Sequence, residues 1–173
     1  MSQTANLMVA VFDQVVCVKI CGKADFTSSL DLKRLINELW ERGYNRFVFE
    51  LCECVTMDST FLGMLSGIGL KFYDGKAPRG SPLELFNPNP RIAETLDNLG
   101  VAHLFKITIA EPLTENYQPL SKAPGTTRAD VTRTCLEAHK TLMGINPQNA
   151  LKFKDVAQFL AEDLKRQEIS DKQ

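Results

Sequence analysis

Asp58-Ser59-Thr60 places a carboxylate and two hydroxyls directly before an apolar segment with helical spacing. A side-chain oxygen at a helix start accepts hydrogen bonds from backbone N–H groups that have no partner within the helix. A serine there is also held rigidly at the solvent boundary, where the N-terminal end of a helix tolerates an anion such as phosphate. The residues alone therefore allow two interpretations: a helix cap, or a cap that also presents a hydroxyl for phosphorylation.

Signatures of catalysis are scarce in the rest of the chain. Neither a Gly-x-x-x-x-Gly-Lys-Ser/Thr phosphate loop nor a Gly-x-Gly-x-x-Gly dinucleotide motif occurs. The sequence around Ser66, Leu65-Ser66-Gly67, does not have the Gly-x-Ser-x-Gly pattern of a hydrolase nucleophile elbow. We interpret the two histidines, His103 and His139, as structural or exposed. We therefore expect a protein that is not an enzyme and that needs no cofactor.

The five cysteines do not predict a disulfide framework or a metal site. Their number is odd, and no secretory signal precedes them. Neither closely spaced pair has the Cys-x-x-Cys spacing of a zinc site, and no histidine lies near either pair. Small buried apolar side chains are the ordinary role of free cysteine. The residues concerned are Cys17, Cys21, Cys52, Cys54 and Cys135.

The charge pattern excludes some classes of partner. The formal net charge is −1, and both signs are mixed along the chain, so no basic field exists to attract nucleic acid or anionic lipid. No apolar run approaches the roughly 18–20 residues that span a bilayer. The first residues, Met1 to Ala5, do not resemble a signal peptide. We expect a cytoplasmic protein with neither nucleic-acid nor membrane partners.

The hydrophobic periodicity predicts strands alternating with helices in the order β-β-α-β-α-β-α-β. Such alternation indicates an α/β fold with a small mixed sheet of about five strands, covered by helices. Within the helix after Asp58, Gly63 and Gly67 each cost about 1 kcal/mol relative to alanine, so we expect this helix to approach the sheet closely. The predicted strands are 7–12, 15–21, 46–51, 83–86 and 104–109, and the intervening helices begin near 27, 59 and 89.

Asp58-Ser59-Thr60 followed by Leu62-Gly63 resembles the core of a STAS domain, the family of bacterial anti-sigma factor antagonists. The preceding strand, Phe47 to Leu51, lies where that family has one. Further similarity comes from Gly22 and Asp25, which match a Gly-x-x-Asp motif, and from the later helix Ile92…Leu96…Gly100 and strand Phe105–Ile109. The resemblance covers about residues 7–110 and implies the STAS fold for a domain at 1–110.

The resemblance also implies a function. Antagonists of this family bind an anti-sigma factor that is itself a serine kinase; phosphorylation of the serine after the motif's aspartate releases them, and a serine phosphatase restores them. On this chain the phosphorylated residue would be Ser59, with Thr60 as the alternative. Asp25, Asp58, Ser59 and Thr60 would contribute to partner contact. The alternative function is a STAS scaffold or ligand-sensing subunit of another complex, in lipid transport or stress signalling, without a sigma-factor role.

Phe61 departs from the commonest form of the family, which has glycine at this position. A glycine lets the backbone of a partner approach closely, whereas phenylalanine adds bulk. The ring either packs into the core or serves as an aromatic anchor for the partner. We expect the outward or half-buried position, and we include Phe61 among the partner-binding residues.

A C-terminal extension follows the predicted STAS domain. Residues 111–126 contain three prolines and predict a connector, and residues 127–173 predict two helices, at about 130–143 and 146–167. The apolar stripes Leu136…Leu142 and Phe153…Leu164 fit two roles. They cover the STAS domain, which we expect, or they bind a partner or a second copy, so a homodimer is possible.

Overall fold

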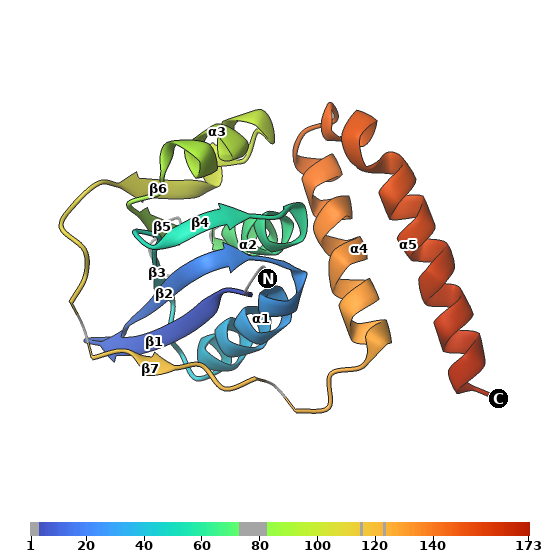
Figure 1. The fold of residues 1–173 in the computed structure, drawn as a ribbon, viewed down its shortest axis with the longest axis horizontal. Helices are drawn as coiled ribbons and strands as arrows, with labels where there is room; N and C mark the ends of the chain where they lie inside the picture. The colour runs from blue at the N-terminus through green and yellow to red at the C-terminus, as the bar shows by residue number, and fades with distance from the viewer. Residues whose placement is uncertain (1–3, 73–82, 115, 123) are drawn as a thin grey trace.

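The structure, a computed structural model, describes residues 4–72, 83–114, 116–122 and 124–173 (Figure 1). In this part of the chain seven strands form one mixed sheet, with the order β6-β5-β3-β2-β1-β7 and with β4 paired to the end of β2. The pairs β1–β2 and β1–β7 are antiparallel, and all other pairs are parallel. The strands are β1 (Asn6–Phe12), β2 (Val15–Ala24), β3 (Arg46–Glu50), β4 (Cys54–Met57), β5 (Leu83–Phe86), β6 (Phe105–Thr108) and β7 (Gln118–Pro119). The predicted α/β fold with a mixed sheet is confirmed.

The hairpin between β1 and β2 has the two-residue turn that the sequence spacing predicts. Asp13 and Gln14 both have positive φ, 45° and 69°, as a turn with two left-handed central residues requires. The strand β2 then runs past Gly22, where the prediction ended it. Gly22 has a φ of 95°, and the pairing with β4 shifts register between Gly22 and Lys23. A bulge at glycine thus lets one strand pair with β3 and then with β4.

Alternating side chains of β3 divide the interior into two clusters. Phe47 and Phe49 point into the main core, which also contains residues of the helices α1 (Phe26–Glu41), α2 (Ser59–Lys71) and α3 (Pro90–Asn98). Val48 points to the opposite face, where it packs with Ala10 and Cys17 under Leu113 and Tyr117 of the connector. The two-residue period of a strand between two covered faces explains this pattern.

Two long C-terminal helices stand beside the STAS-like part of the chain (Figure 1). They are α4 (Arg128–Ile145) and α5 (Asn149–Asp171), and α4 lies between α5 and the pair α1 and α2. Leu142 of α4 is fully buried and belongs to the main core, and Phe153 of α5 packs against its edge. The extension therefore packs on the domain through α4, while α5 packs mainly on α4.

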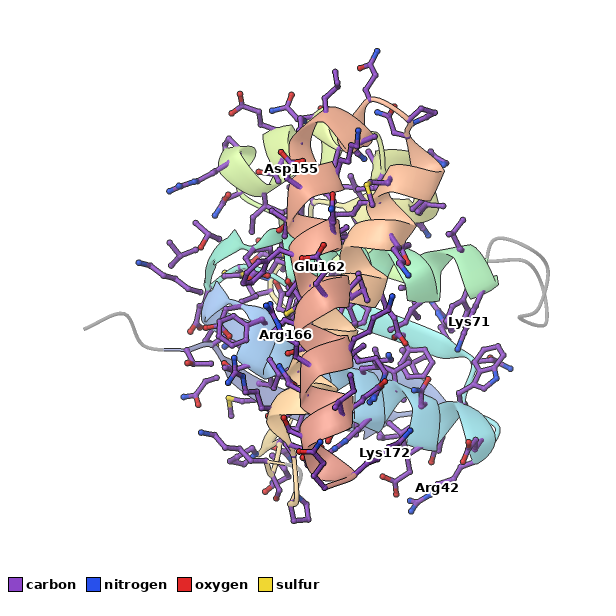
Figure 2. All side chains as sticks on the ribbon, turned by 90° about the vertical axis from the view of Figure 1, so that its right-hand side faces the viewer. Arg42, Lys71, Asp155, Glu162, Arg166 and Lys172 are labelled. Carbon is purple, nitrogen blue, oxygen red and sulfur yellow. The ribbon has the colours of Figure 1, made fainter. Side chains whose placement is uncertain are left out.

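The outer face of α5 carries charges of both signs. Figure 2 shows Asp155, Glu162 and Arg166 along this helix, and all three are exposed. Alternating signs on an exposed helix face are typical of a solvated surface. The same helix also exposes Leu151, Val156 and Phe159.

In the described residues, no helix has both the length and the apolar character needed to cross a membrane.

Candidate functional site at the start of α2

Asp58 is the N-cap of α2 and joins two helices. Its Oδ1 accepts a hydrogen bond from the backbone N–H of Phe61 at 2.8 Å, and its Oδ2 accepts one from the backbone N–H of Phe26 at 2.9 Å. The Asp58 backbone N–H in turn donates to the carbonyl of Ala24. Burial raises the pKa of the Asp58 carboxyl, and the nearby Asp25 adds to the rise. The carboxylate thus fixes the start of α1 relative to the start of α2.

Asp25 caps α1 in a capping box. Its Oδ1 accepts the backbone N–H groups of Thr27 and Ser28, and the Ser28 hydroxyl is bonded back to the Asp25 backbone. Asp25 and Asp58 therefore both hold helix ends in place. They also line one open groove of 380 Å³ together with Lys23 and Arg91. The two predicted partner-contact carboxylates are brought together as neighbours at the C-terminal ends of the paired strands β2 and β4.

Ser59 is the first residue of α2 and is half-buried. Its Oγ lies 2.9 Å from Nε2 of His139, on α4. The Nδ1 of His139 lies 2.6 Å from the carbonyl oxygen of Cys135, which can only accept, so Nδ1 carries a hydrogen. In the neutral ring Nε2 is then an acceptor, and the Ser59 hydroxyl donates to it. The predicted phosphorylation site thus has a buried histidine as its partner.

The role of His139 was not predicted from the sequence, which indicated only a structural or exposed histidine. The side chain is 5% exposed and packs edge-on against the ring of Phe153, with 5.0 Å between ring centroids. Ser59 and His139 are 80 residues apart in the chain. The four-residue spacing between Cys135 and His139 explains the Nδ1 contact, but no local pattern connects this helix to Ser59.

Thr60 and Phe61 both point inward. Thr60 is 5% exposed and lies against the thiol of Cys135. Phe61 is fully buried in the main core, so the expectation of an outward or half-buried ring is wrong. The physical reason is that Phe61, Leu65, Ile68 and Phe72 follow one another at spacings of four, three and four, which makes one apolar stripe on α2.

The close approach expected at Gly63 is made to a helix, not to the sheet. A Cβ on Gly63 would overlap the backbone carbonyl of Ala138 on α4. At Gly67, one turn later, the nearest atoms are those of Thr141 at 3.8 Å, which is an ordinary contact. The expectation that both glycines serve a close packing is thus wrong for Gly67. At Gly63, about one turn after Ser59, α4 therefore packs directly on the backbone of α2.

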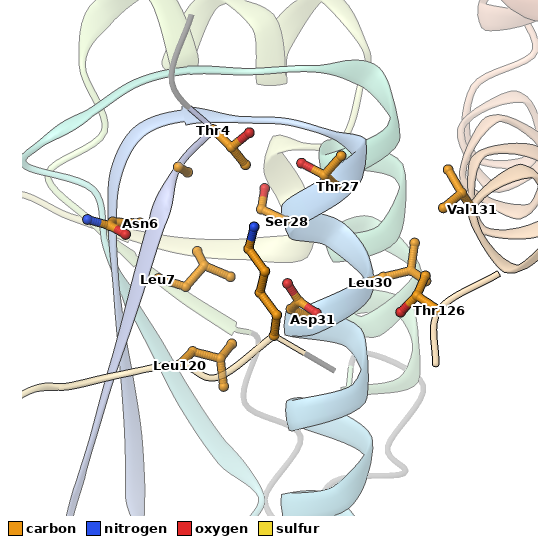
Figure 3. Close-up of a pocket in the computed structure, with 12 residues that line it drawn as sticks. Thr4, Asn6, Leu7, Thr27, Ser28, Leu30, Asp31, Leu120, Thr126 and Val131 are labelled. Carbon is orange, nitrogen blue, oxygen red and sulfur yellow. The ribbon is translucent and has the colours of Figure 1, made fainter. Parts of the chain in front are cut away.

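A second cavity, of 270 Å³, lies between the start of β1, α1 and the connector (Figure 3). Its lining is mixed, with Leu7 and Leu120 beside Ser28, Asp31 and Lys122. It does not include Ser59 or His139. None of the five cysteines, all of which lie in the described part of the chain, takes part in a disulfide. In the described ranges, no group of three or more His, Cys, Asp or Glu side chains could hold a metal ion.

Two similar solved structures with TM-scores above 0.5 share the fold over 59–61% of this chain. The anti-sigma factor antagonist SpoIIAA in its unphosphorylated form is 16% identical over 61% of this chain and 89% of its own, with a TM-score of 0.51. The NMR structure of the protein TM1081 is 19% identical over 59% and 79%, also with a TM-score of 0.51. An anti-sigma factor antagonist from Mycobacterium paratuberculosis is 16% identical over 60% and 84%, with a TM-score of 0.49.

Comparison of the sequence with known proteins gives the family. No curated protein matches this chain. The family model described as STAS domain matches residues 6–115, from the first strand into the connector. This range includes β1 to β6 and the capped start of α2, and it covers more than half of the chain. The protein is therefore a member of the STAS domain family.

Proposed function

We propose that this protein is an anti-sigma factor antagonist that binds an anti-sigma serine kinase while Ser59 is unmodified and is released when Ser59 is phosphorylated. The observation that carries the proposal is the Ser59 hydroxyl at the first position of α2, a helix start that the Asp58 carboxylate caps and ties to the start of α1. The proposal places the protein in the cytoplasm, where a kinase has ATP and a serine phosphatase restores the unmodified form.

The electrostatics of the site favour a switch that needs no change of fold. A phosphate on Ser59 adds about −1.5 to −2 charges next to Asp58 and Asp25. The N-terminus of α2 tolerates this charge within the domain. A partner that offers no cation opposite Ser59 would bury this charge unpaired, and a loss of about 2.7 kcal/mol weakens binding about a hundredfold.

The surface next to Ser59 offers apolar contacts for such a partner. Phe26 is 45% exposed and directly follows Asp25, and its backbone N–H is the one held by Asp58. Val55 on β4, three residues before Asp58, is 50% exposed. An exposed aromatic ring on a rigidly held helix start is a typical anchor in a protein interface. We assign to Phe26 the anchoring role expected of Phe61, with Asp25 and Asp58 supplying charge beside it.

A second candidate function is supported by the cavity of Figure 3. Its mixture of apolar walls with Ser28, Asp31 and Lys122 would suit a small polar molecule, as a ligand-sensing STAS scaffold requires. Ser59 does not line that cavity, so a substitution in the cavity and a substitution at Ser59 test the two functions separately. Asp31→Ala would impair the second function and leave the first unchanged.

The test is transfer of phosphate from ATP by the anti-sigma serine kinase of the same organism, followed by mass spectrometry of the peptides. We expect label on Ser59, no label on Ser59→Ala, and label still on Ser59 in Thr60→Val, which removes the alternative acceptor. Ser59→Ala should retain kinase binding, whereas Ser59→Glu should weaken it about a hundredfold. Label that persists on Ser59→Ala would contradict the assignment of Ser59.

A further inference from the structure

We propose that the hairpin of α4 and α5 is an intramolecular cover of Ser59, which must move aside before a kinase can reach the hydroxyl. The inference rests on the proposed function. It assigns to the C-terminal extension the control of how fast the switch residue is modified.

The first support is the contact that α4 makes with the acceptor itself. His139 accepts the Ser59 hydroxyl hydrogen at its Nε2, because its Nδ1 is already committed to the carbonyl of Cys135. One turn earlier on α4, the thiol of Cys135 lies against the hydroxyl of Thr60. Residues on one face of α4 thus occupy the hydroxyls of both Ser59 and Thr60.

The second support is the close approach of the two helices. Gly63, one turn after Ser59, has no room for a Cβ against the carbonyl of Ala138. A kinase active site has to surround an acceptor hydroxyl and align it with the γ-phosphate of ATP. In the structure α4 fills the space beside Ser59, an arrangement that we call closed. A kinase therefore needs an open arrangement, in which α4 has moved away from Ser59.

The chemistry of the transfer also conflicts with the closed position. The Ser59 Oγ–P bond forms, the bond from the γ-phosphorus to the bridging oxygen of ATP breaks, ADP leaves, and the hydroxyl proton passes to solvent. Phosphorylated Ser59 has no hydrogen on Oγ to donate to Nε2 of His139. Its phosphate oxygens would instead face the lone pair of this nitrogen. The phosphorylated serine and a neutral His139 cannot keep the geometry that the unmodified pair has.

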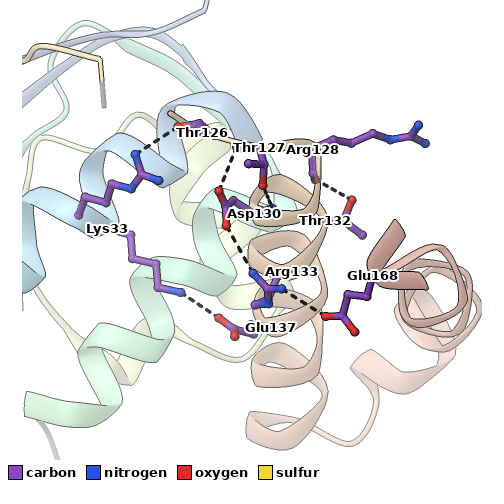
Figure 4. Close-up of polar contacts among 10 residues, drawn as sticks. Lys33, Thr126, Thr127, Arg128, Asp130, Thr132, Arg133, Glu137 and Glu168 are labelled. Carbon is purple, nitrogen blue, oxygen red and sulfur yellow. Dashed lines mark hydrogen bonds and ion pairs between the residues drawn. The ribbon is translucent and has the colours of Figure 1, made fainter. Parts of the chain in front are cut away.

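The attachments of the hairpin differ at its two ends. From the connector to the middle of α4, the hairpin is held to α1 by exposed polar contacts: Arg34 with Thr126 of the connector at 3.2 Å and Lys33 with Glu137 of α4 at 2.8 Å (Figure 4). Contacts of this kind add little stability in water. The other end is anchored in the core by Leu142, and the buried Asn149 amide donates to the carbonyls of Leu99 and Leu142.

This asymmetry gives the motion a direction. Arg133 bonds to Glu168 of α5, so the two helices are also held to each other near the connector end (Figure 4). We expect α4 and α5 to move as one unit, opening from the connector end while Asn149 stays in place. Leu136 and Ala138 are buried in the closed form, so the open form is the minor one and sets the fraction of molecules that a kinase can modify.

The test compares two glycine variants of the full chain. Gly63→Ala forces α4 away from α2, whereas Gly67→Ala makes the same change in the same helix where there is room for the added methyl. The first readout is alkylation of Cys135 by iodoacetamide, because this thiol lies against Thr60 when the cover is closed. The second readout is the initial rate of Ser59 phosphorylation by the anti-sigma kinase with ATP.

We expect Gly63→Ala to increase both rates by about tenfold and Gly67→Ala to leave both unchanged. His139→Ala, with the exposed neighbour Lys140→Ala as its control, keeps the test valid if Gly63→Ala does not fold. His139→Ala should also speed phosphorylation. A slower rate would mean that the imidazole activates the hydroxyl, and would overturn the cover.

Two other outcomes separate this inference from the proposed function. If Ser59 is phosphorylated at the same rate in wild type, Gly63→Ala and His139→Ala while Cys135 alkylation rises in Gly63→Ala, the cover is wrong and the phosphorylation switch stands. If no variant is phosphorylated on Ser59 even where Cys135 reacts freely, the proposed function fails and the cover with it.

Discussion

Asp58 accepts the backbone N–H of Phe26 through Oδ2 at 2.9 Å, although the two residues lie 32 positions apart in the chain. The other oxygen of the same carboxylate caps α2 through Phe61. One side chain therefore sets the position of the start of α1 relative to the start of α2. These bonds to Asp58 do not involve the Ser59 hydroxyl, so a phosphate on Ser59 can act on docking at Asp25 and Phe26 without disturbing the two helix starts.

The shared cap predicts that Asp58→Ala destabilises the fold. Both Phe26 and Phe61 would lose the acceptor for a backbone N–H, and loss of a helix cap of this kind costs about 1–2 kcal/mol. Guanidinium unfolding followed by circular dichroism measures the change. The control is Asp97→Ala, which removes an exposed aspartate from α3 and should shift stability by less than about 0.5 kcal/mol. Equal effects of the two substitutions would contradict the shared cap.

The raised pKa of Asp58 predicts a pH dependence of stability. Burial raises this pKa above its usual 3.8, so in the pH range just above 3.8 the folded chain binds more protons than the unfolded chain. The contribution of this group to stability therefore falls as pH rises through that range and returns on acidification. Asp58→Asn does not titrate, and it keeps one acceptor oxygen for the cap.

The measurement is the difference in unfolding midpoint between wild type and Asp58→Asn from about pH 3 to pH 7. The unfolding midpoint of wild type should fall relative to that of Asp58→Asn as pH rises, and the difference should become constant near neutrality. A difference that is the same at every pH would show that the carboxyl has its ordinary pKa in the folded chain.

Cys52 and Cys54 lie two residues apart and should differ sharply in reactivity. Burial raises the pKa of the Cys54 thiol to about 11, whereas Cys52 is exposed. At pH 8 only about one Cys54 in a thousand would be a thiolate, the form that reacts. Iodoacetamide should label Cys52 in the native protein and both residues after unfolding. Fragment spectra of the peptide that contains both residues assign the label, and equal native labelling would contradict the burial of Cys54.

The order of the elements could be predicted because each has a local signal. The alternation of Phe47, Val48 and Phe49 marks a strand covered on both faces, and the Asn89-Pro90 pair marks the start of α3, where Asn89 does cap the helix. The strand β4 was not predicted. It is only four residues long, it exposes Val55, and it exists because β2 continues past the bulge at Gly22.

Only those residues of the candidate site that are neighbours in the sequence could be predicted. Asp58 and Ser59 are neighbours in a cap motif that a sequence shows directly. His139 comes from a helix that begins about seventy residues later, and its position follows from the packing of α4 on Gly63, which is a tertiary event. The orientation of Phe61 was within reach of periodicity, because it shares a stripe with Leu65 and Ile68.

Glu50 at the end of β3 predicts a further structural effect. This carboxylate is fully buried and accepts the backbone N–H of Cys52, the amide of Asn87 and the backbone N–H of Leu113. It thereby joins the loop before β4, the end of β5 and the connector. Glu50→Ala would leave these donors without an acceptor and should cost about 3 kcal/mol or more in unfolding free energy.

The matched control for Glu50→Ala is Glu53→Ala. Glu53 pairs with Lys19 at the surface, and pairs of this kind contribute about 0–1 kcal/mol. Urea unfolding of both variants separates the two cases. A Glu50→Ala variant as stable as Glu53→Ala would mean that the three donors find other acceptors.

Asn149 predicts how firmly the C-terminal hairpin is anchored. It is fully buried at the start of α5, and its amide nitrogen donates to the carbonyl of Leu99 at 2.9 Å and to that of Leu142 at 2.8 Å. Asn149→Ala removes both bonds and should cost about 1–3 kcal/mol, since the Leu142 carbonyl keeps its bond from Asn146. Lys152→Ala, which removes one exposed bond to Asn98, should change stability by less than about 0.5 kcal/mol. Hydrogen exchange distinguishes the cause: faster exchange confined to α4 and α5 in Asn149→Ala indicates a local anchor, whereas uniform acceleration would mean that the hairpin and the STAS domain unfold together.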